Sequence, residues 1–194
     1  MKKIIKLMIA SILALVILLS FASCGIFNKI DIKDVRKAMK DLIRKDDDKY
    51  AIGDMDNKEE GLEYAFESIF DIKGDIEGMA QLVDDDGNWV LAVEFEYTED
   101  AKAVAKDLED KMIDVIIEAY VYEDKKYYQE ELGMNSAEIA DMIEEWKKEA
   151  AEDPGELLPD DLAVERQGNI VFCGSEDLIE DLIEAIEDAR KSIF

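Results

Sequence analysis

The amino-acid sequence predicts an α+β fold in two layers, an antiparallel sheet of about four strands with helices covering one face. Two stretches carry this prediction, because each reads as a hairpin followed by an amphipathic helix, which makes two ββα units. A further amphipathic helix precedes both units. The 48% apolar content is too high for a disordered acidic chain, and 194 residues suffice for one domain with its own core.

The first of these helices is predicted to begin at Asp31. Its apolar residues recur at helical spacing on one side, at Ile32, Val35, Met39, Leu42 and Ile43. The charged stretch RKDDDKYAIGDMDNKEEG then interrupts the pattern. LEYAFESIF fits either a short helix or a strand, and the spacing of its apolar residues favours the helix.

The clearest hairpin lies in DIEGMAQLVDDDGNWVLAVEFEYTED, where Asp86–Gly87 supplies a tight turn. Beyond the turn, Leu91, Val93, Phe95 and Tyr97 alternate with Ala92, Glu94 and Glu96. This period of two predicts one buried and one solvated face. Thr98 is expected to cap the next helix. The acidic residues of its first turn interact favourably with the positive end of the helix dipole.

That helix is expected to continue through the tyrosine-rich segment and to stop near Gly133. A further helix is expected to start at Asn135 or Ser136, and a loop holds both prolines. LAVERQGNIVFCGSED then predicts the second hairpin, with Ser175 capping the last helix. The repeated order of turn, strand, cap and helix fits either an old duplication or the same capping chemistry used twice.

The first 23 residues have the layout of a secretory signal peptide. Three lysines lie within the first six residues, an uncharged and mostly apolar run covers residues 7–21, and two small residues precede Cys24. A positive start stays on the cytoplasmic side of the membrane. We therefore expect the remainder of the chain to be exported.

The segment Phe21-Ala22-Ser23-Cys24, followed by Gly25, resembles the lipobox of bacterial lipoproteins. The resemblance implies that the Cys24 thiol receives a diacylglycerol and that the peptide is cut just before it, although the family prefers Leu at the position of Phe21. A two-chain lipid gives stable membrane attachment. The alternative is an uncleaved membrane helix, for which residues 7–24 approach the lower limit of length.

Both alternatives place the protein at the outer face of the cytoplasmic membrane. The predicted organisation is a signal peptide (1–23), a lipid-anchored tether (24–30) and a single acidic α+β domain (31–194). The strand leading into Thr98-Glu99-Asp100-Ala101-Lys102 also resembles a loose group of small clostridial-type lipoproteins. That resemblance implies the same architecture and indicates nothing about activity.

Charge and composition exclude several classes of function. The chain carries 49 acidic and 23 basic residues and no histidine, giving a net charge of −26. This field repels nucleic acid and anionic lipid, and it attracts basic proteins and divalent cations. The absence of histidine removes the commonest general base and histidine-ligated zinc. No cofactor motif is present in the sequence.

Carboxylates supply the candidates for chemistry, but none gives a complete motif. Glu94 and Glu96 share one strand face at a separation that suits two-carboxylate hydrolysis, but a solvated strand face is the favoured explanation. Asp54-x-Asp56 begins like a calcium loop, yet Lys58 and Glu59 occupy positions that need an oxygen ligand and glycine. We therefore assign no catalytic, metal or cofactor residue, and leave weak binding of a divalent cation open.

The remaining candidates are a thiol and the aromatic side chains. Cys173 lies next to a predicted helix start, where a thiolate is favoured, but an unpaired cysteine on a strand is usually a core residue. The spacing of Trp146 also indicates the core. An exposed cluster of tyrosines would instead form an interaction patch, and its members would be Tyr120, Tyr122, Tyr127 and Tyr128.

These observations favour a membrane-anchored extracytoplasmic lipoprotein with a non-catalytic binding domain. The expected partners are the membrane, through the lipid, and a basic protein or a weakly bound divalent cation. The alternatives are a carboxylate-dependent extracytoplasmic hydrolase and an accessory subunit of a membrane complex. A cleft with two facing acids would indicate the hydrolase, whereas an exposed tyrosine patch without a pocket would indicate the accessory subunit.

Overall fold

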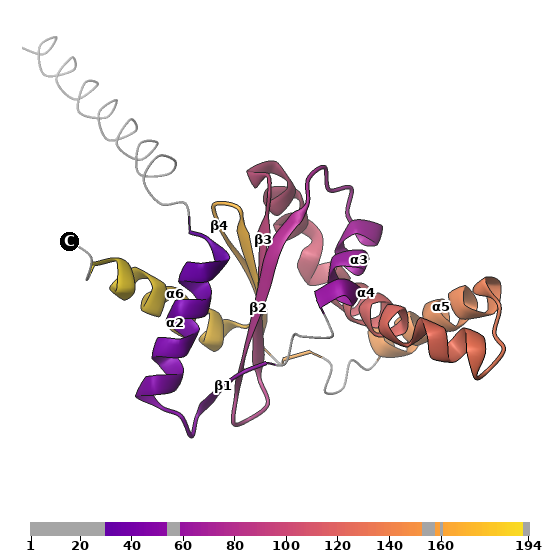
Figure 1. Cartoon of the computed structure of the whole chain (residues 1–194), viewed down its shortest axis with the longest axis horizontal. Helices are drawn as coiled ribbons and strands as arrows, with labels where there is room; N and C mark the ends of the chain where they lie inside the picture. Colours follow the sequence, from indigo (N-terminus) through magenta and orange to yellow (C-terminus); the bar gives the residue numbers. More distant parts are fainter. Residues whose placement is uncertain (1–29, 54–58, 153–157, 160, 192–194) are drawn as a thin grey trace, which may run out of the picture.

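The computed structural model describes residues 30–53, 59–152, 158–159 and 161–191. The signal peptide, Cys24 and the Asp54-x-Asp56 segment lie outside these residues. Within these residues, ten elements follow one another: α2 (Ile32–Lys45), β1 (Tyr50–Ile52), α3 (Glu59–Ile69), β2 (Ile76–Asp84), β3 (Trp89–Phe95), α4 (Thr98–Glu130), α5 (Ser136–Glu152), β4 (Leu162–Gln167), β5 (Ile170–Ser175) and α6 (Glu176–Lys191). The predicted α+β class is confirmed (Figure 1).

The strands form one antiparallel sheet in the order β1-β2-β3-β5-β4. The two predicted hairpins, β2–β3 and β4–β5, join along their inner strands, where Leu91 pairs with Cys173 and Ala92 with Phe172. The sheet has five strands because the short β1 adds to the outer edge of β2, pairing Tyr50 with Asp84. β1 was not predicted from the sequence, because it lies in the charged stretch that interrupts the helical pattern.

Helices cover both faces of the sheet, which corrects the expectation of two layers. α2 and α6 lie against one face and α3 and α4 against the other (Figure 1). Ala92 and Phe172 face the α2–α6 layer, and their pairing partners Leu91 and Cys173 face the α3–α4 layer. β3 therefore has no solvated face, and even Glu94 is only 5% exposed.

The local signals for helix starts were right at two helices. The Asp31 carboxylate accepts the backbone N–H groups of Lys33 and Asp34 at 2.9 and 3.0 Å, and so caps α2. At α5, Asn135 accepts the N–H groups of Ala137 and Glu138, and the Glu138 carboxylate accepts the N–H of Asn135 at 2.8 Å. This reciprocal pair is a capping box.

The predicted caps at the other two helices are wrong. Thr98 is the first residue of α4, and the preceding Tyr97 makes no side-chain capping bond. Ser175 does precede α6, but its hydroxyl donates to the Asp161 carboxylate at 2.8 Å. That carboxylate, which belongs to the segment before β4, also lies 3.5 Å from the backbone N of Asp177. A carboxylate from the segment before β4 therefore contacts the N-terminal turn of α6.

α4 is the longest element and extends beyond the sheet. Its 33 residues end before Gly133, as predicted, where a φ of 69° turns the chain into α5. α5 packs back along the second half of α4 to form the α4–α5 hairpin, which projects to one side of the sheet (Figure 1). Among the described helices, none has both the length and the apolar character needed to cross a membrane.

Gly174 allows the two hairpins to join. Its φ is 139°, and a Cβ at this position would press into the carbonyl oxygen of Trp89 and lie 2.8 Å from the Cα of Val90. Backbone atoms of β3 cannot move aside without breaking the sheet. Only glycine fits this point of the β3–β5 pairing.

We predict that Gly174→Ala lowers the free energy of unfolding by more than the ~1–3 kcal/mol of backbone strain, because the clash with β3 adds to it. Chemical denaturation measures this loss. Gly87→Ala is the matched control, since Gly87 also has a positive φ, of 88°, but meets no atom within 4 Å. Equal losses for the two variants would contradict the role given to the close contact.

Candidate functional site

The carboxylate of Glu94 is buried and serves to hold three elements together. Its Oε2 accepts the backbone N–H of Ile32, the first residue of α2, at 2.8 Å. Its Oε1 accepts from Nδ2 of Asn169 at 3.1 Å, and the same Nδ2 donates to the carbonyl of Phe95 at 2.8 Å. Glu94 thus connects β3 to the start of α2 and to the β4–β5 turn.

Glu96 points to different partners, so the two acids do not form a facing pair. Glu96 is exposed, and its Oε2 lies 3.3 Å from the backbone N of Asp75. A third acid, Asp100, is 3% exposed and accepts the N–H groups of Lys73 and Gly74 at 3.0 and 2.9 Å. The proposed solvated face is therefore wrong for Glu94, and all three carboxylates hold backbone groups.

We predict that Glu94→Gln destabilises the fold by about 1–3 kcal/mol, because one of the two donors then faces an amide NH₂ group. Thermal or chemical denaturation measures this change. Glu96→Gln is the matched control and should alter stability by less than about 0.5 kcal/mol. If Glu94→Gln left the free energy of unfolding unchanged, the buried carboxylate would not be needed to hold α2 on the sheet.

Cys173 is a core residue, as the sequence indicated. It is fully buried in the α3–α4 layer, and its Sγ lies 3.7 Å from the carbonyl oxygen of Leu91. Burial raises the pKa of the thiol to about 12. A neutral thiol in this position is not a nucleophile at ordinary pH.

Among the described residues, no group of three or more acidic or thiol side chains is placed so that it could hold a metal ion. At the β2–β3 turn, Asp84 accepts both the backbone N–H and the Nδ2 of Asn88, at 2.8 and 3.0 Å. This acid stabilises the turn around Gly87. The Asp54-x-Asp56 segment lies outside the described residues.

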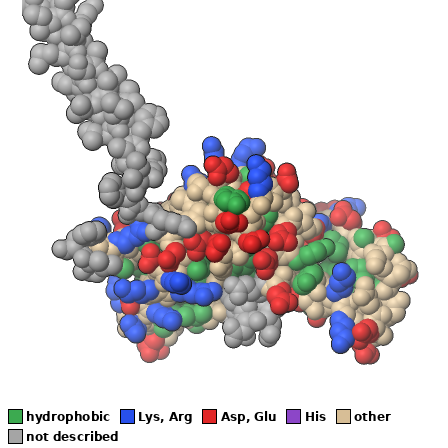
Figure 2. Space-filling view, turned by 45° about the horizontal axis from the view of Figure 1, so that its top comes forward, with side chains coloured by type: hydrophobic (Ala, Val, Ile, Leu, Met, Phe, Trp, Pro, Cys, Tyr) green, Lys and Arg blue, Asp and Glu red, His purple; other side chains and the backbone are tan. Residues whose placement is uncertain are grey.

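A groove between α3, α4 and α5 is a candidate for binding. It encloses about 240 Å³. Its walls come from all three helices and comprise Tyr64, Glu118, Val121, Tyr122, Lys125, Ser136, Ile139, Ala140 and Ile143. Hydrophobic side chains gather over the α4–α5 side of the molecule between patches of acid (Figure 2). The groove therefore combines an apolar floor with charged margins.

Tyrosines form one wall of the groove. The rings of Tyr64 and Tyr122 stack with their centroids 4.5 Å apart at an angle of 23°. Tyr120 and Tyr127 are each more than half exposed, whereas Tyr128 is buried against Trp146. The expected tyrosine cluster thus divides: Tyr122 lines the groove, Tyr128 lies in the core of the α4–α5 hairpin, and Tyr120 and Tyr127 are exposed outside the groove lining.

A partly buried ion pair fixes α5 against α4 at the groove. Nζ of Lys147 lies 2.7 Å from Oε1 of Glu118, and the other Glu118 oxygen accepts from Ser68 of α3 at 2.7 Å. Burial alone lowers the pKa of Lys147, but the hydrogen bond and the charge of Glu118 outweigh it and raise the pKa above its ordinary value. The ammonium charge of Lys147 therefore persists at neutral pH.

Sequence reasoning missed Tyr64 and Glu118 as groove residues. Tyr64 lies in a segment for which only a short helix was predicted, and no role was predicted for Glu118. Helical spacing on α4 places Glu118 and Tyr122 one turn apart, which would have paired these two. Nothing local to α3 indicates that Tyr64 meets Tyr122.

Comparison with known proteins adds no assignment: no protein family, curated protein or solved structure matches this chain.

Proposed function

We propose that this protein is an extracytoplasmic lipoprotein, anchored through Cys24, whose domain binds a basic partner protein without catalysis. The groove between α3, α4 and α5 carries the binding part of this proposal. The signal-like start and the segment ending at Cys24 support the anchor. The two parts are independent, and each has its own test.

The charge around the groove favours a cationic partner. Residues 113–152, which include the second half of α4 and all of α5, carry twelve acidic and four basic side chains. The tyrosine faces of the groove wall also attract Lys and Arg groups. The charged groups that line the groove itself are Lys125 and Glu118, which pairs with Lys147. A segment with an apolar side chain flanked by basic residues would fill the floor and meet the acidic residues of α4 and α5 around it.

The described carboxylates give the hydrolase alternative less support. Glu94 and Asp100, which are buried, already accept backbone N–H groups. Glu118, the acid of the groove, is paired with Lys147. A general acid or base needs a proton that it can exchange with a substrate, and these acids are committed to structural bonds.

We predict that Cys24→Ala abolishes incorporation of a fatty-acid probe in cells that express the full chain, because the second cysteine is sealed in the core. Gel fluorescence measures the label. Cys173→Ala is the matched control and should keep full labelling. Equal labelling of Cys24→Ala and the parent chain would refute lipidation at this residue.

We predict that replacing Tyr64 and Tyr122 together with serine weakens binding of cationic peptides with a central apolar residue by about tenfold. Isothermal titration with such a peptide panel measures the dissociation constants. Tyr97→Ser is the matched control, since Tyr97 is similarly exposed but precedes α4 at the far end from the groove. Unchanged affinity in the double variant would exclude the groove as the binding surface.

A further inference from the structure

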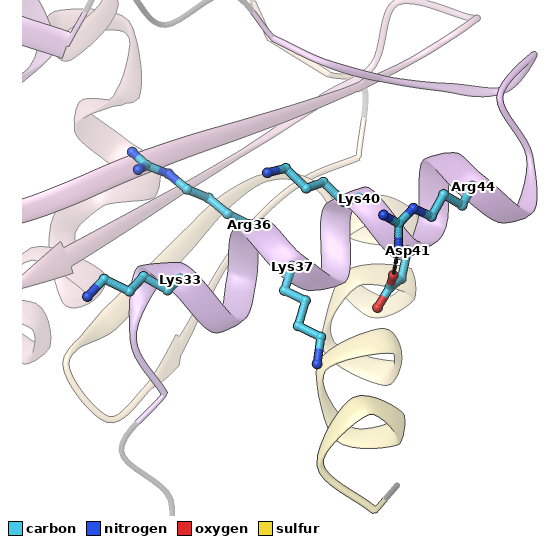
Figure 3. A pocket seen from close by; sticks show the side chains of 6 residues that line it. All are labelled: Lys33, Arg36, Lys37, Lys40, Asp41 and Arg44. Atoms are coloured by element: carbon cyan, nitrogen blue, oxygen red, sulfur yellow. Dashed lines mark hydrogen bonds and ion pairs between the residues drawn. The ribbon is translucent and has the colours of Figure 1, made fainter. Parts of the chain in front are cut away.

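The exposed side of α2 is cationic, although the chain as a whole is strongly acidic. Five basic residues and one acid line a shallow hollow of about 430 Å³ along this helix: Lys33, Arg36, Lys37, Lys40, Asp41 and Arg44 (Figure 3). We call these five basic residues the α2 basic face. The net charge of −26 conceals it, because the excess of acid lies elsewhere on the molecule.

Helical periodicity gathers these residues on one side. Positions 33, 37, 40 and 44 follow one another at steps of three or four, position 36 lies three after 33 and four before 40, and each of these side chains is exposed. The opposite side of α2 packs on the sheet through Val35, Ala38 and Leu42. The same amphipathic pattern that seats α2 therefore presents its cations outward.

Little of this positive charge is neutralised by neighbouring residues. Among the described residues, Lys33, Lys37 and Lys40 form no ion pair, while Asp41 pairs with Arg44 at 3.3 Å. Arg36 donates to the carbonyl of Met79 at 2.7 Å, which holds its guanidinium over the edge of β2. The face thus keeps most of its charge for an external anion.

The position of α2 in the chain brings this face close to the proposed anchor. Eight residue steps separate Cys24 from Ile32, so the connection spans at most about 28 Å even when fully extended. A tether this short keeps α2 at high local concentration near the membrane surface. An anionic surface attracts basic segments placed next to an anchor.

The position of α2 in the fold also favours an orientation with α2 toward the membrane. α2 lies on one side of the sheet, and the acidic α4–α5 hairpin lies on the other (Figure 1). When α2 faces an anionic membrane, the acidic hairpin and its groove point away, which limits their repulsion. α6, which shares the α2 layer, carries seven acidic and two basic side chains, so the attraction is confined to the outward side of α2. The exposed, open arrangement of the α2 basic face suits an array of headgroups better than a single enclosed ligand.

We propose that the α2 basic face docks on the anionic lipid headgroups of the membrane that holds the anchor. This inference rests on the proposed membrane attachment and adds an orientation to it. The sequence alone indicated repulsion from anionic lipids, because net charge averages over faces that the fold keeps apart.

Acetylation of lysines on the vesicle-bound full chain tests the proposal. The chain is reconstituted into vesicles of phosphatidylcholine, alone or mixed with phosphatidylglycerol, and acetylation is followed by mass spectrometry on floated vesicles. Lys33, Lys37 and Lys40 should react about fivefold more slowly on anionic vesicles, and about 0.5 M salt should remove this protection. Lys125 and Lys126 of α4 should react equally on both vesicles.

A variant pair separates docking from general attraction. Lys37→Gln with Lys40→Gln should reduce the protection of Lys33, whereas Lys125→Gln with Lys126→Gln should leave it unchanged. Equal acetylation of the three α2 lysines on both kinds of vesicle would overturn the proposal. Failure of the anchor would instead appear as chain missing from the floated fraction.

Two further outcomes would assign the face to another occupant and overturn docking on lipid. Protection on neutral vesicles by added soluble polyphosphate, equal to that on anionic vesicles, would indicate a site for phosphate polymers. Protection on neutral vesicles that rises with protein density would indicate a second copy of this acidic chain.

Discussion

The structure depends on the burial of β3 and β5 from both sides. These two strands form the centre of the sheet, and their side chains alternate between the α2–α6 layer and the α3–α4 layer. Removing apolar surface from water on both faces supplies most of the driving force for this arrangement. The three-layer architecture, the buried thiol of Cys173 and the sealed carboxylate of Glu94 all follow from this constraint.

A polar residue within such a strand must find internal partners. Glu94 solves this problem by accepting the N–H of Ile32, whose position at the positive end of α2 favours a negative charge. The same carboxylate accepts from Asn169, so the α2 layer is fixed to both hairpins through one side chain. The bond therefore also sets where the α2 basic face lies relative to the sheet.

Local signals predicted the elements well and their layering poorly. Asp31, Asn135 and the Gly87 turn act within a few residues of themselves, so the sequence near them was sufficient. The side of the sheet that each helix covers depends on contacts across the whole chain. Ala92 and Glu94 resembled the polar half of an alternating strand, yet one is small enough to pack beneath helices and the other is paired internally.

The candidate groove shows the same limit. The tyrosine cluster on α4 was recognisable from composition, but its division into buried and exposed members required α5, and the stacking of Tyr64 on Tyr122 required α3.

The helix positions also bear on the origin of the two ββα units. β3 and β5 are antiparallel neighbours, so a two-fold axis relating the hairpins would place α4 and α6 on the same face, and they lie on opposite faces.

The unbroken course of α4 has a mechanical consequence. Neither glycine nor proline interrupts its 33 residues, so about 50 Å of continuous helix joins the part packed on the sheet to the part that walls the groove. Without an intervening hinge, α4 acts as a rigid lever. Any load applied at its far end would be passed to the sheet as torque rather than absorbed by bending.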